Sequence, residues 1–263
     1  MNQSQPDSHT NRLQSVFSAE TFDLPWTLEQ EGLTDRPRAL HCQVNDFSAG
    51  LIPDNYEPRY PYPLILWLPD SECDTDEALE HIGHLSPQNY VGLAVEDCII
   101  QDSLSGTAFP HPHSLDSAVD QLRRLVEIEN RIITAVRSFR EMINVHTERI
   151  FIAGLGKGAL TAMLVAIHQP EWFGGCISFC GQYPAAASLF PPRPETRGKR
   201  FWLSSPGGRA NVAAASATRN AAGRLVSSGA DVTTHIDDSS QHVSPGLLRD
   251  LDKWLMHGIL SDS

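Results

Sequence analysis

The stretch that decides the fold is "RIFIAGLGKGALTAMLVAIHQP", residues 149–170. Its first part, residues 149–154, is a short apolar run typical of a strand that is covered on both faces. A glycine-rich turn follows, and residues 159–168 have the composition of a buried helix. A strand, a tight turn and a helix in this order predict one βα unit of a parallel sheet.

The rest of the chain repeats this alternation of strands and helices. Further strands are expected at residues 39–47, 64–69, 90–95, 176–180, 201–205 and 231–236. Further helices are expected at residues 74–85, 113–144, 211–228 and 245–259. Residues 51–63 are rich in proline and tyrosine and are expected to be a connector. The alternation predicts a three-layer α/β/α domain with a mostly parallel, doubly wound sheet.

The longest expected helix has apolar residues that recur at a spacing near 3.6, and we expect this stripe to pack in the core rather than on a partner. The stripe consists of Leu115, Val119, Leu122, Val126, Ile133, Val136 and Ile143.

Length and composition limit the kind of protein this is. The chain has 263 residues, 41% of them hydrophobic, which is enough for a sizeable core. We expect a polar, mobile arm at residues 1–35 and one domain over residues 36–263. The formal net charge of -12 argues against nucleic acid as a partner. The sequence has no membrane span or secretion signal and only five cysteines, so a cytoplasmic protein is expected.

The glycine-rich turn has three interpretations, and the first is a nucleotide site. Gly154, Gly156 and Ala159 match the letters of the dinucleotide pattern G-x-G-x-x-A. However, the acidic residue expected about 20 positions later is missing. A phosphate loop fits worse, because Phe151 occupies the place of its first glycine. A nucleotide-binding α/β protein therefore stays as an alternative.

The second interpretation is a nucleophile elbow, G-x-S-x-G, in which the serine has been replaced. Residues 154–158 read G-L-G-K-G and keep both flanking glycines, while Gly156 takes the place of the nucleophile. His242 lies between the last expected strand and the last expected helix, where such enzymes have their base. The third interpretation is a plain βα connection whose glycines serve only packing.

Four segments together resemble one family. They are "YPLILWLPD", "NYVGLAVED", "VHTERIFIAGLGKGALTAMLVAIHQPEWFGGCISFCGQYP" and "GADVTTHIDDSSQHVSPGLLRDLDKWL". Their content and order are similar to α/β-hydrolases of the phospholipase/carboxylesterase group, which includes the acyl-protein thioesterase-like esterases. The resemblance implies the α/β-hydrolase fold and, for an intact site, hydrolysis of carboxylic esters.

The catalytic positions implied by the resemblance are mostly changed in this chain. Gly156 replaces the serine, and Arg209 occupies the position of the acid. Pro69-Asp70 stands where the oxyanion loop of the family begins with His-Gly. Only His242 matches. Because acyl transfer needs a nucleophilic atom and an oriented base, we expect a non-catalytic pseudohydrolase that binds a small ligand or a protein partner.

A small acyl or anionic ligand is the expected occupant of the site. Lys157 opens the helix after the turn, and its backbone N–H could hold such a group at the helix N-terminus. The expected ligand-binding residues are Asp70, Ser71, Lys157 and His242. The natural ligand and the oligomeric state stay open.

An active esterase with a relocated nucleophile is the alternative within the same family. Cys73 and Cys98 follow expected strands, and a thiolate beside His242 would be a good nucleophile. No metal or cofactor is expected, because the two close histidine pairs lack the further ligands of a zinc site. The pairs are His81 with His84 and His111 with His113.

Overall fold

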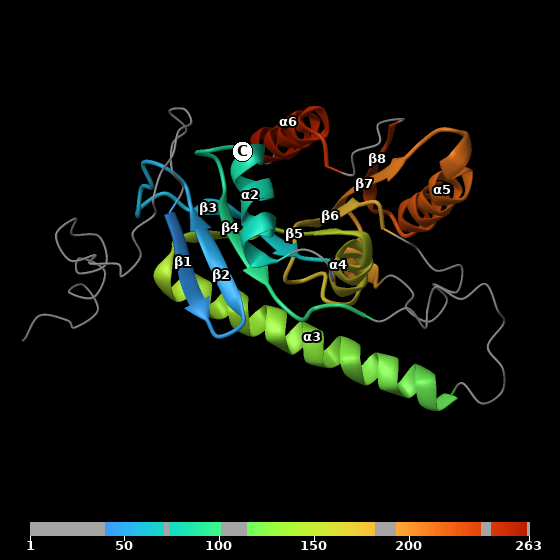
Figure 1. Cartoon of the computed structure of the whole chain (residues 1–263), viewed down its shortest axis with the longest axis horizontal. Helices are drawn as coiled ribbons and strands as arrows, with labels where there is room; N and C mark the ends of the chain where they lie inside the picture. The colour runs from blue at the N-terminus through green and yellow to red at the C-terminus, as the bar shows by residue number, and fades with distance from the viewer. Residues whose placement is uncertain (1–39, 71–73, 101–114, 182–192, 238–242, 262–263) are drawn as a thin grey trace, which may run out of the picture. The chain divides into compact units, whose positions relative to one another are not determined.

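The computed structural model describes residues 40–70, 74–100, 115–181, 193–237 and 243–261. The expected arm at residues 1–35 lies outside the described residues, and the domain limits stay a prediction. The strands are β1 (Leu40–Asn45), β2 (Ser48–Ile52), β3 (Tyr62–Leu68), β4 (Val91–Val95), β5 (Val145–Leu155), β6 (Gly175–Phe179), β7 (Arg200–Pro206) and β8 (Asp231–Asp237). The α-helices are α2 (Thr75–Leu85), α3 (Leu115–Met142), α4 (Gly156–His168), α5 (Val212–Ser227) and α6 (Pro245–Ser261) (Figure 1).

All the described strands belong to one sheet, in the order β1-β2-β4-β3-β5-β6-β7-β8. The pairs from β4 to β8 are parallel, whereas β1 pairs with β2, and β2 with β4, in antiparallel fashion. The mostly parallel sheet is therefore confirmed. The connector expected at residues 51–63 was wrong at both ends, because Leu51 and Ile52 complete β2, and Tyr62 and Pro63 begin β3. The strand β2 has only five residues, which are too few to show a clear alternation of apolar and polar side chains.

Helices cover both faces of the sheet, and β3 shows how its residues divide between them. Leu64, Leu66 and Leu68 pack in one hydrophobic cluster with α3, α4 and α5. Ile65 and Trp67 pack in the other cluster with α2 and α6. Since successive strand residues point to opposite faces, a fully apolar strand feeds two cores at once. The expected three-layer α/β/α architecture is confirmed.

Two helix starts follow ordinary capping chemistry. The Asp74 carboxylate accepts a hydrogen bond of 2.9 Å from the Glu77 N–H at the start of α2. The Ser244 hydroxyl accepts one of 3.2 Å from the Leu247 N–H, just before Pro245 begins α6. In contrast, α4 begins without a side-chain cap at Leu155. The first turn of α4 therefore depends on its close packing against the ends of β3 and β5.

The buried face of α3 differs from the expected apolar stripe. Val119, Leu122 and Val126 are 56%, 45% and 42% exposed, so this part of the stripe is not core. Val136 and Ile143 are buried as expected. The described core residues of α3 are Leu125, Ile128, Ile132, Ala135, Val136 and Phe139.

A buried glutamate explains why the sequence pattern did not indicate the buried face of α3. Glu129 lies among the core residues of α3 and is only 3% exposed. Its carboxylate contacts Nδ1 of His168 and accepts a hydrogen bond of 2.9 Å from Nε2 of Gln169. Because Glu129 interrupts the apolar spacing on the buried face of α3, the sequence pattern indicated the neighbouring face instead. The burial of Glu129 is tolerable because its carboxylate contacts His168, the last residue of α4, and Gln169, which follows it.

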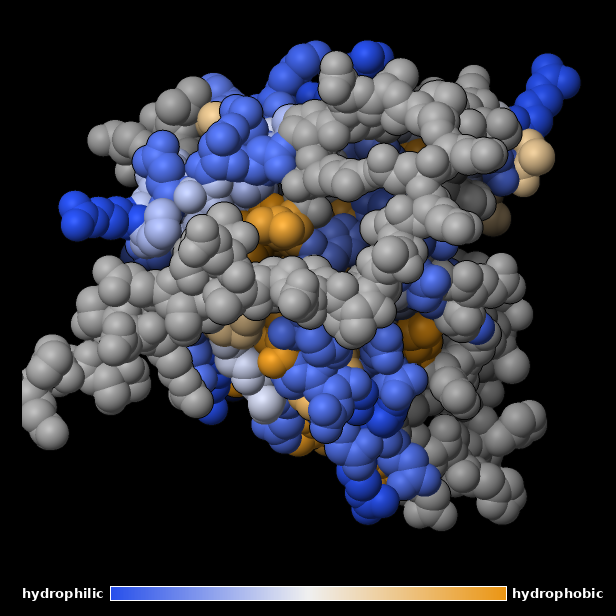
Figure 2. Space-filling model, turned by 60° about the vertical axis from the view of Figure 1, so that its left-hand side comes forward, coloured by the Kyte–Doolittle hydropathy of each residue, from blue (hydrophilic) through white to orange (hydrophobic). Residues whose placement is uncertain are grey.

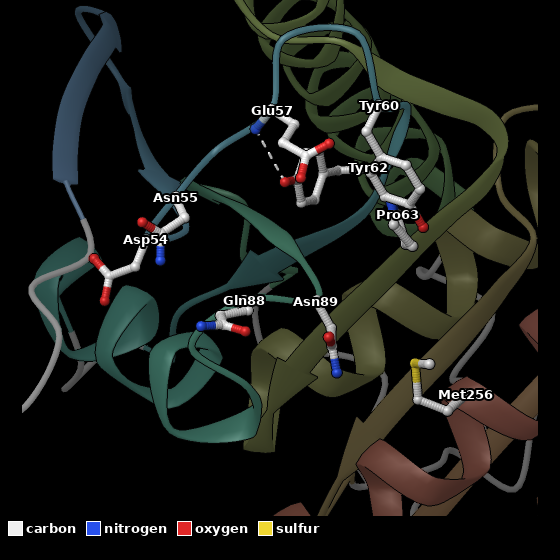
Figure 3. A pocket seen from close by; sticks show the side chains of 9 residues that line it. All are labelled: Asp54, Asn55, Glu57, Tyr60, Tyr62, Pro63, Gln88, Asn89 and Met256. Atoms are coloured by element: carbon white, nitrogen blue, oxygen red, sulfur yellow. Dashed lines mark hydrogen bonds between the residues drawn. The ribbon is translucent and has the colours of Figure 1, made fainter.

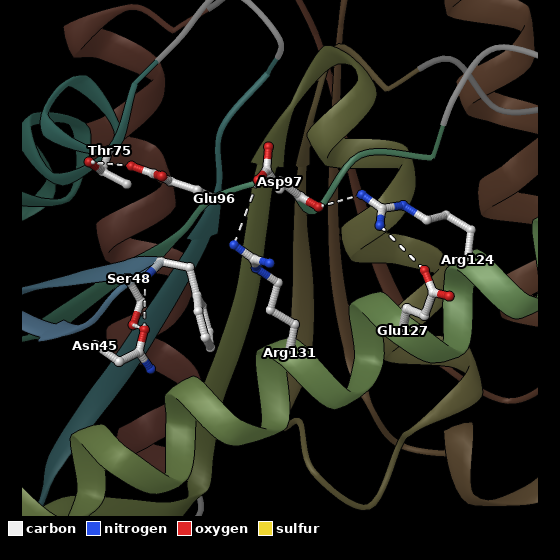
Figure 4. A network of polar contacts seen from close by, with 9 residues as sticks. Asn45, Ser48, Thr75, Glu96, Asp97, Arg124, Glu127 and Arg131 are labelled. Atoms are coloured by element: carbon white, nitrogen blue, oxygen red, sulfur yellow. Dashed lines mark hydrogen bonds and ion pairs between the residues drawn. The ribbon is translucent and has the colours of Figure 1, made fainter.

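Two arginines tie α3 to the end of β4 (Figure 4). Arg124 donates a hydrogen bond of 2.9 Å to the backbone oxygen of Asp97, and Arg131 lies 3.7 Å from its carboxylate. The guanidinium of Arg131 also lies 4.2 Å from the ring centre of Phe47, at a cation–π distance. Asp97 has a φ of 54°, a left-handed conformation that aspartate tolerates better than most residues.

The surface agrees with a core that is buried between layers. On the face shown in Figure 2, hydrophilic side chains predominate among the described residues, and apolar ones form small separate areas. Within the described residues, no helix is both long and apolar enough to cross a membrane.

The face of α3 can be tested with a matched pair of leucines. Leu125 is 0% exposed and Leu122 is 45% exposed. We expect Leu125→Ala to lower the free energy of unfolding by about 2–5 kcal/mol through the cavity it leaves. Leu122→Ala should change it by about 0.5 kcal/mol or less. Urea unfolding followed by circular dichroism measures both, and a larger loss for Leu122→Ala would contradict the packing.

Candidate functional site

The candidate site lies where the parallel strands end. Leu68 of β3 pairs with Gly154 of β5, so the segments that follow these two strands leave the sheet side by side. One of them leads to Asp70 and the other to Gly156. In open α/β sheets, ligands bind at this carboxyl edge. The structure thus brings together residues that are 86 positions apart.

The turn at Gly154–Gly158 has the geometry of a nucleophile elbow. Gly156 has a φ of 56°, the left-handed region that a glycine adopts without strain. A Cβ atom on Gly154 would approach backbone atoms of Gly158 and Ala159 to less than 3.0 Å. A Cβ atom on Gly158 would be equally close to the carbonyl oxygen of Leu68. Both flanking glycines are therefore required because strand and helix approach so closely.

The carboxylate of Asp70 lies at the tip of the elbow. A Cβ atom on Gly156 would come within 3.0 Å of Oδ2 of Asp70, so this oxygen takes the space that a nucleophile side chain would need. Asp70 is half-buried. It lies beside the first residue of α4, where the N–H groups of a helix carry partial positive charge and favour a carboxylate.

Lys157 is the second residue of α4, and hydrogen bonds through Thr161 connect it to the segment after β4. Its backbone oxygen accepts a hydrogen bond of 3.2 Å from the hydroxyl of Thr161, which is itself fully buried. The same hydroxyl accepts a bond of 3.1 Å from the N–H of Ile100, beyond the end of β4. The first turn of α4 is thus connected to the segment after a second strand, which stiffens the elbow.

The other expected site residues are only partly located. Arg209 lies in the 3-10 turn Arg209–Asn211, after the end of β7, and its side chain is exposed. Ser71, His242 and Cys73 lie outside the described residues. The structure therefore gathers Asp70, Gly156 and Lys157 at the elbow and gives no geometry for a histidine beside them.

The two described cysteines at this edge, Cys98 and Cys180, are poor nucleophiles at neutral pH. Cys98 is only 2% exposed, and burial raises the pKa of its thiol to about 12. Cys180, which sequence reasoning placed inside a strand, lies just beyond β6 in a left-handed conformation with a φ of 54°. Burial raises the pKa of this thiol to about 11. No pattern in the sequence could have indicated that conformation for Cys180.

Of the first histidine pair, His81 packs against Trp67, whereas His84 is exposed. The rings of His81 and Trp67 are tilted by 36° with 5.1 Å between their centres, and burial lowers the pKa of His81. Its Nε2 atom lies 4.0 Å from Oε1 of Glu77. Among the described residues, no group of three or more His, Cys, Asp or Glu side chains is arranged to hold a metal ion. The pair His111 and His113 lies outside those residues.

With this geometry, the domain has the α/β-hydrolase fold, and several of the similar solved structures are esterases. A phospholipase/carboxylesterase from Dyadobacter fermentans has 12% identity and a TM-score of 0.57, over 84% of this chain and 100% of that chain. The S-formylglutathione hydrolase FrmB from Staphylococcus aureus has 8% identity and a TM-score of 0.58, over 85% and 99%. A thermostable esterase has 16% identity and a TM-score of 0.54, over 84% and 62%.

These likenesses concern the fold, because the identities are too low to transfer an activity. This chain spans 62% of the length of the thermostable esterase. No family model matches the sequence, and no curated protein matches it. The resemblance that the sequence suggested is therefore supported at the level of the fold, and the chemistry must be argued from the site.

The elbow glycines give a sharp stability test. Gly158→Ala should lower the free energy of unfolding by about 1–3 kcal/mol, because its Cβ atom would press on rigid backbone. Gly223→Ala, in α5, is the control, since nothing lies within 4 Å of the added atom. That change should raise stability by about 0.5–1 kcal/mol. Thermal unfolding measures both, and equal effects would refute the close approach at the elbow.

Proposed function

We propose that this protein is a pseudohydrolase, an α/β-hydrolase-fold protein that binds a ligand or partner without hydrolysing esters. The observation that carries the proposal is the carboxylate of Asp70 at the tip of the elbow, where Gly156 leaves room for it. The two residues form a matched pair, because a side chain at position 156 and the present place of Asp70 exclude each other. The elbow tip thus not only lacks a serine but also holds the carboxylate of Asp70.

The missing chemistry is specific. Acyl transfer in this fold needs an oxygen or sulfur atom at the elbow tip to form the acyl-enzyme. Gly156 has none, and the acid position holds the exposed Arg209, which cannot orient a histidine. Loss of one triad member already lowers the rate by several orders of magnitude. Two changes and an altered oxyanion loop support a binding role.

The kind of ligand follows from the charge at the elbow. An anion at the N-terminus of α4 would meet the carboxylate of Asp70, which already lies at that end of the helix. Like charges at close range repel each other strongly when they are partly desolvated. Of the two ligand classes that the sequence suggested, an uncharged acyl group is therefore favoured over an anion. The same repulsion disfavours a nucleotide phosphate at this turn.

A divergent esterase with a cysteine nucleophile is the weaker alternative. Cys98 would have to be a thiolate at neutral pH, but burial raises the pKa of its thiol to about 12. It would also need access to substrate, although its side chain is only 2% exposed. Both properties are opposite to those of reactive cysteines, which are exposed and have lowered pKa values.

Hydrolysis of p-nitrophenyl acetate and butyrate tests the proposal. We expect the wild-type protein to match the buffer rate at neutral pH, because Gly156 puts no nucleophilic atom at the elbow tip. Gly156→Ser alone should stay inactive, since the serine would collide with Asp70 and lack an acid partner.

Control variants identify the residue responsible if the wild-type protein hydrolyses these esters. Wild-type turnover well above buffer that disappears in Cys98→Ala or His242→Ala would overturn the pseudohydrolase and support the alternative. Asp70→Gly combined with Gly156→Ser removes the collision and should accept the serine with a smaller loss of stability than Gly156→Ser alone. The opposite order of stabilities would show that Asp70 does not occupy the tip.

A further inference from the structure

A cleft lies at the opposite edge of the sheet, where the parallel strands begin. Its volume is about 320 Å³, at the lower end for small-molecule sites. Tyr62 and Pro63 at the start of β3 line it, together with Gln88 and Asn89 just before β4. None of the elbow residues contributes to it, so the cleft is separate from the site described above.

The charged side chains that line this cleft are all acidic. Asp54 and Glu57 supply two carboxylates, and no lysine or arginine is among the described residues that line it. Oδ2 of Asp54 is buried and has no hydrogen-bond partner among the described residues. Because no described donor pairs with this oxygen, the Asp54 carboxylate adds negative potential beside the cleft. Arg59 belongs to the same loop but is exposed and not part of the lining.

Helix ends add to this negative potential. Because the helices run back across the parallel sheet, α2 ends at Leu85, three residues before Gln88 of the cleft. The helix α3 ends at Met142, and the carbonyl oxygen of Asn144 accepts a hydrogen bond of 2.9 Å from the Tyr62 N–H. The C-terminal end of a helix carries partial negative charge and favours a cation. The residues that follow both helix ends contact the loop that carries the two carboxylates: the Asp54 N–H donates to the oxygen of Pro87, and Asn144 donates to the oxygen of Pro58.

Aromatic rings supply the apolar part of the cleft (Figure 3). Tyr60 and Tyr62 meet edge to face with 4.8 Å between ring centres. The hydroxyl of Tyr62 accepts a hydrogen bond of 3.1 Å from the Glu57 N–H, which fixes the loop so that Glu57 and both rings stay together. Tyr60 is 45% exposed, and Met256 of α6 lines the same cleft. Ring faces attract cations, and a thioether contacts methyl and methylene groups well.

We propose that this cleft binds a small organic cation, an ammonium or guanidinium group that carries an apolar body. The carboxylates of Asp54 and Glu57 and the two helix ends attract the positive charge, while Tyr60, Tyr62 and Met256 contact the carbon atoms around it. A single metal ion would not use the rings, and an anion would be repelled. This inference is independent of the function proposed for the elbow.

Calorimetric titration of the full chain with choline and with agmatine tests the site. We expect one of these cations to bind saturably with one site per chain. The uncharged alcohol in which carbon replaces the nitrogen of choline should bind at least about tenfold more weakly than choline, because it has the same shape without the charge. This comparison uses the wild-type protein and does not depend on the folding of any variant.

Variants then assign the binding to this cleft. Asp54→Asn combined with Glu57→Gln should weaken the binding of the cation at least about tenfold. Tyr60→Leu should weaken it less, because it removes a ring but keeps apolar contact. Asp120→Asn, which changes an exposed aspartate near the opposite end of α3, is the control and should leave affinity unchanged. No binding of either cation at ~20 mM, or equal affinity in the double variant, would overturn the proposal.

Discussion

The structure depends on the close approach of the first turn of α4 to the ends of β3 and β5. At Gly154 and Gly158 an added Cβ atom would lie within 3.0 Å of backbone atoms, which cannot move aside as a side chain can. The approach lets α4 cross the sheet directly above its central strands and bury most of its residues. It also places the N-terminus of that helix, with its partial positive charge, at the carboxyl edge where the fold has its site.

The use of that edge is decided by one pair of residues. In a working hydrolase the elbow tip holds a nucleophile under backbone strain, whereas Gly156 adopts the same conformation without strain. The space that is released holds the carboxylate of Asp70, which gains the favourable field of the helix end. Under the function proposed above, a carboxylate takes the place that a nucleophile has in a working hydrolase. The architecture stays that of the esterases to which the fold is similar.

The two edges of the sheet are electrostatically different because every crossover helix runs in the opposite direction to its strands. The carboxyl edge has helix starts and suits negative groups, and Asp70 already provides one there. The opposite edge has the ends of α2 and α3, where Asp54 and Glu57 add further negative charge. A cation at the second edge and an uncharged acyl group at the first are therefore compatible occupants of one domain.

The sequence by itself determined the βα alternation, the mostly parallel sheet and the elbow, because continuous apolar strands and closely spaced glycines are local signals. It could not show that Asp70 lies at the elbow tip, because that contact depends on the pairing of β3 with β5 over a separation of 86 residues. It also misplaced the buried face of α3, since the partners that make Glu129 tolerable come from α4. No sequence motif indicated the cleft at Asp54 and Tyr62, because it is formed jointly by the loops before β3 and β4 and by the distant helix α6. Tertiary structure decided these features, because each rests on groups that only the folded sheet brings into contact.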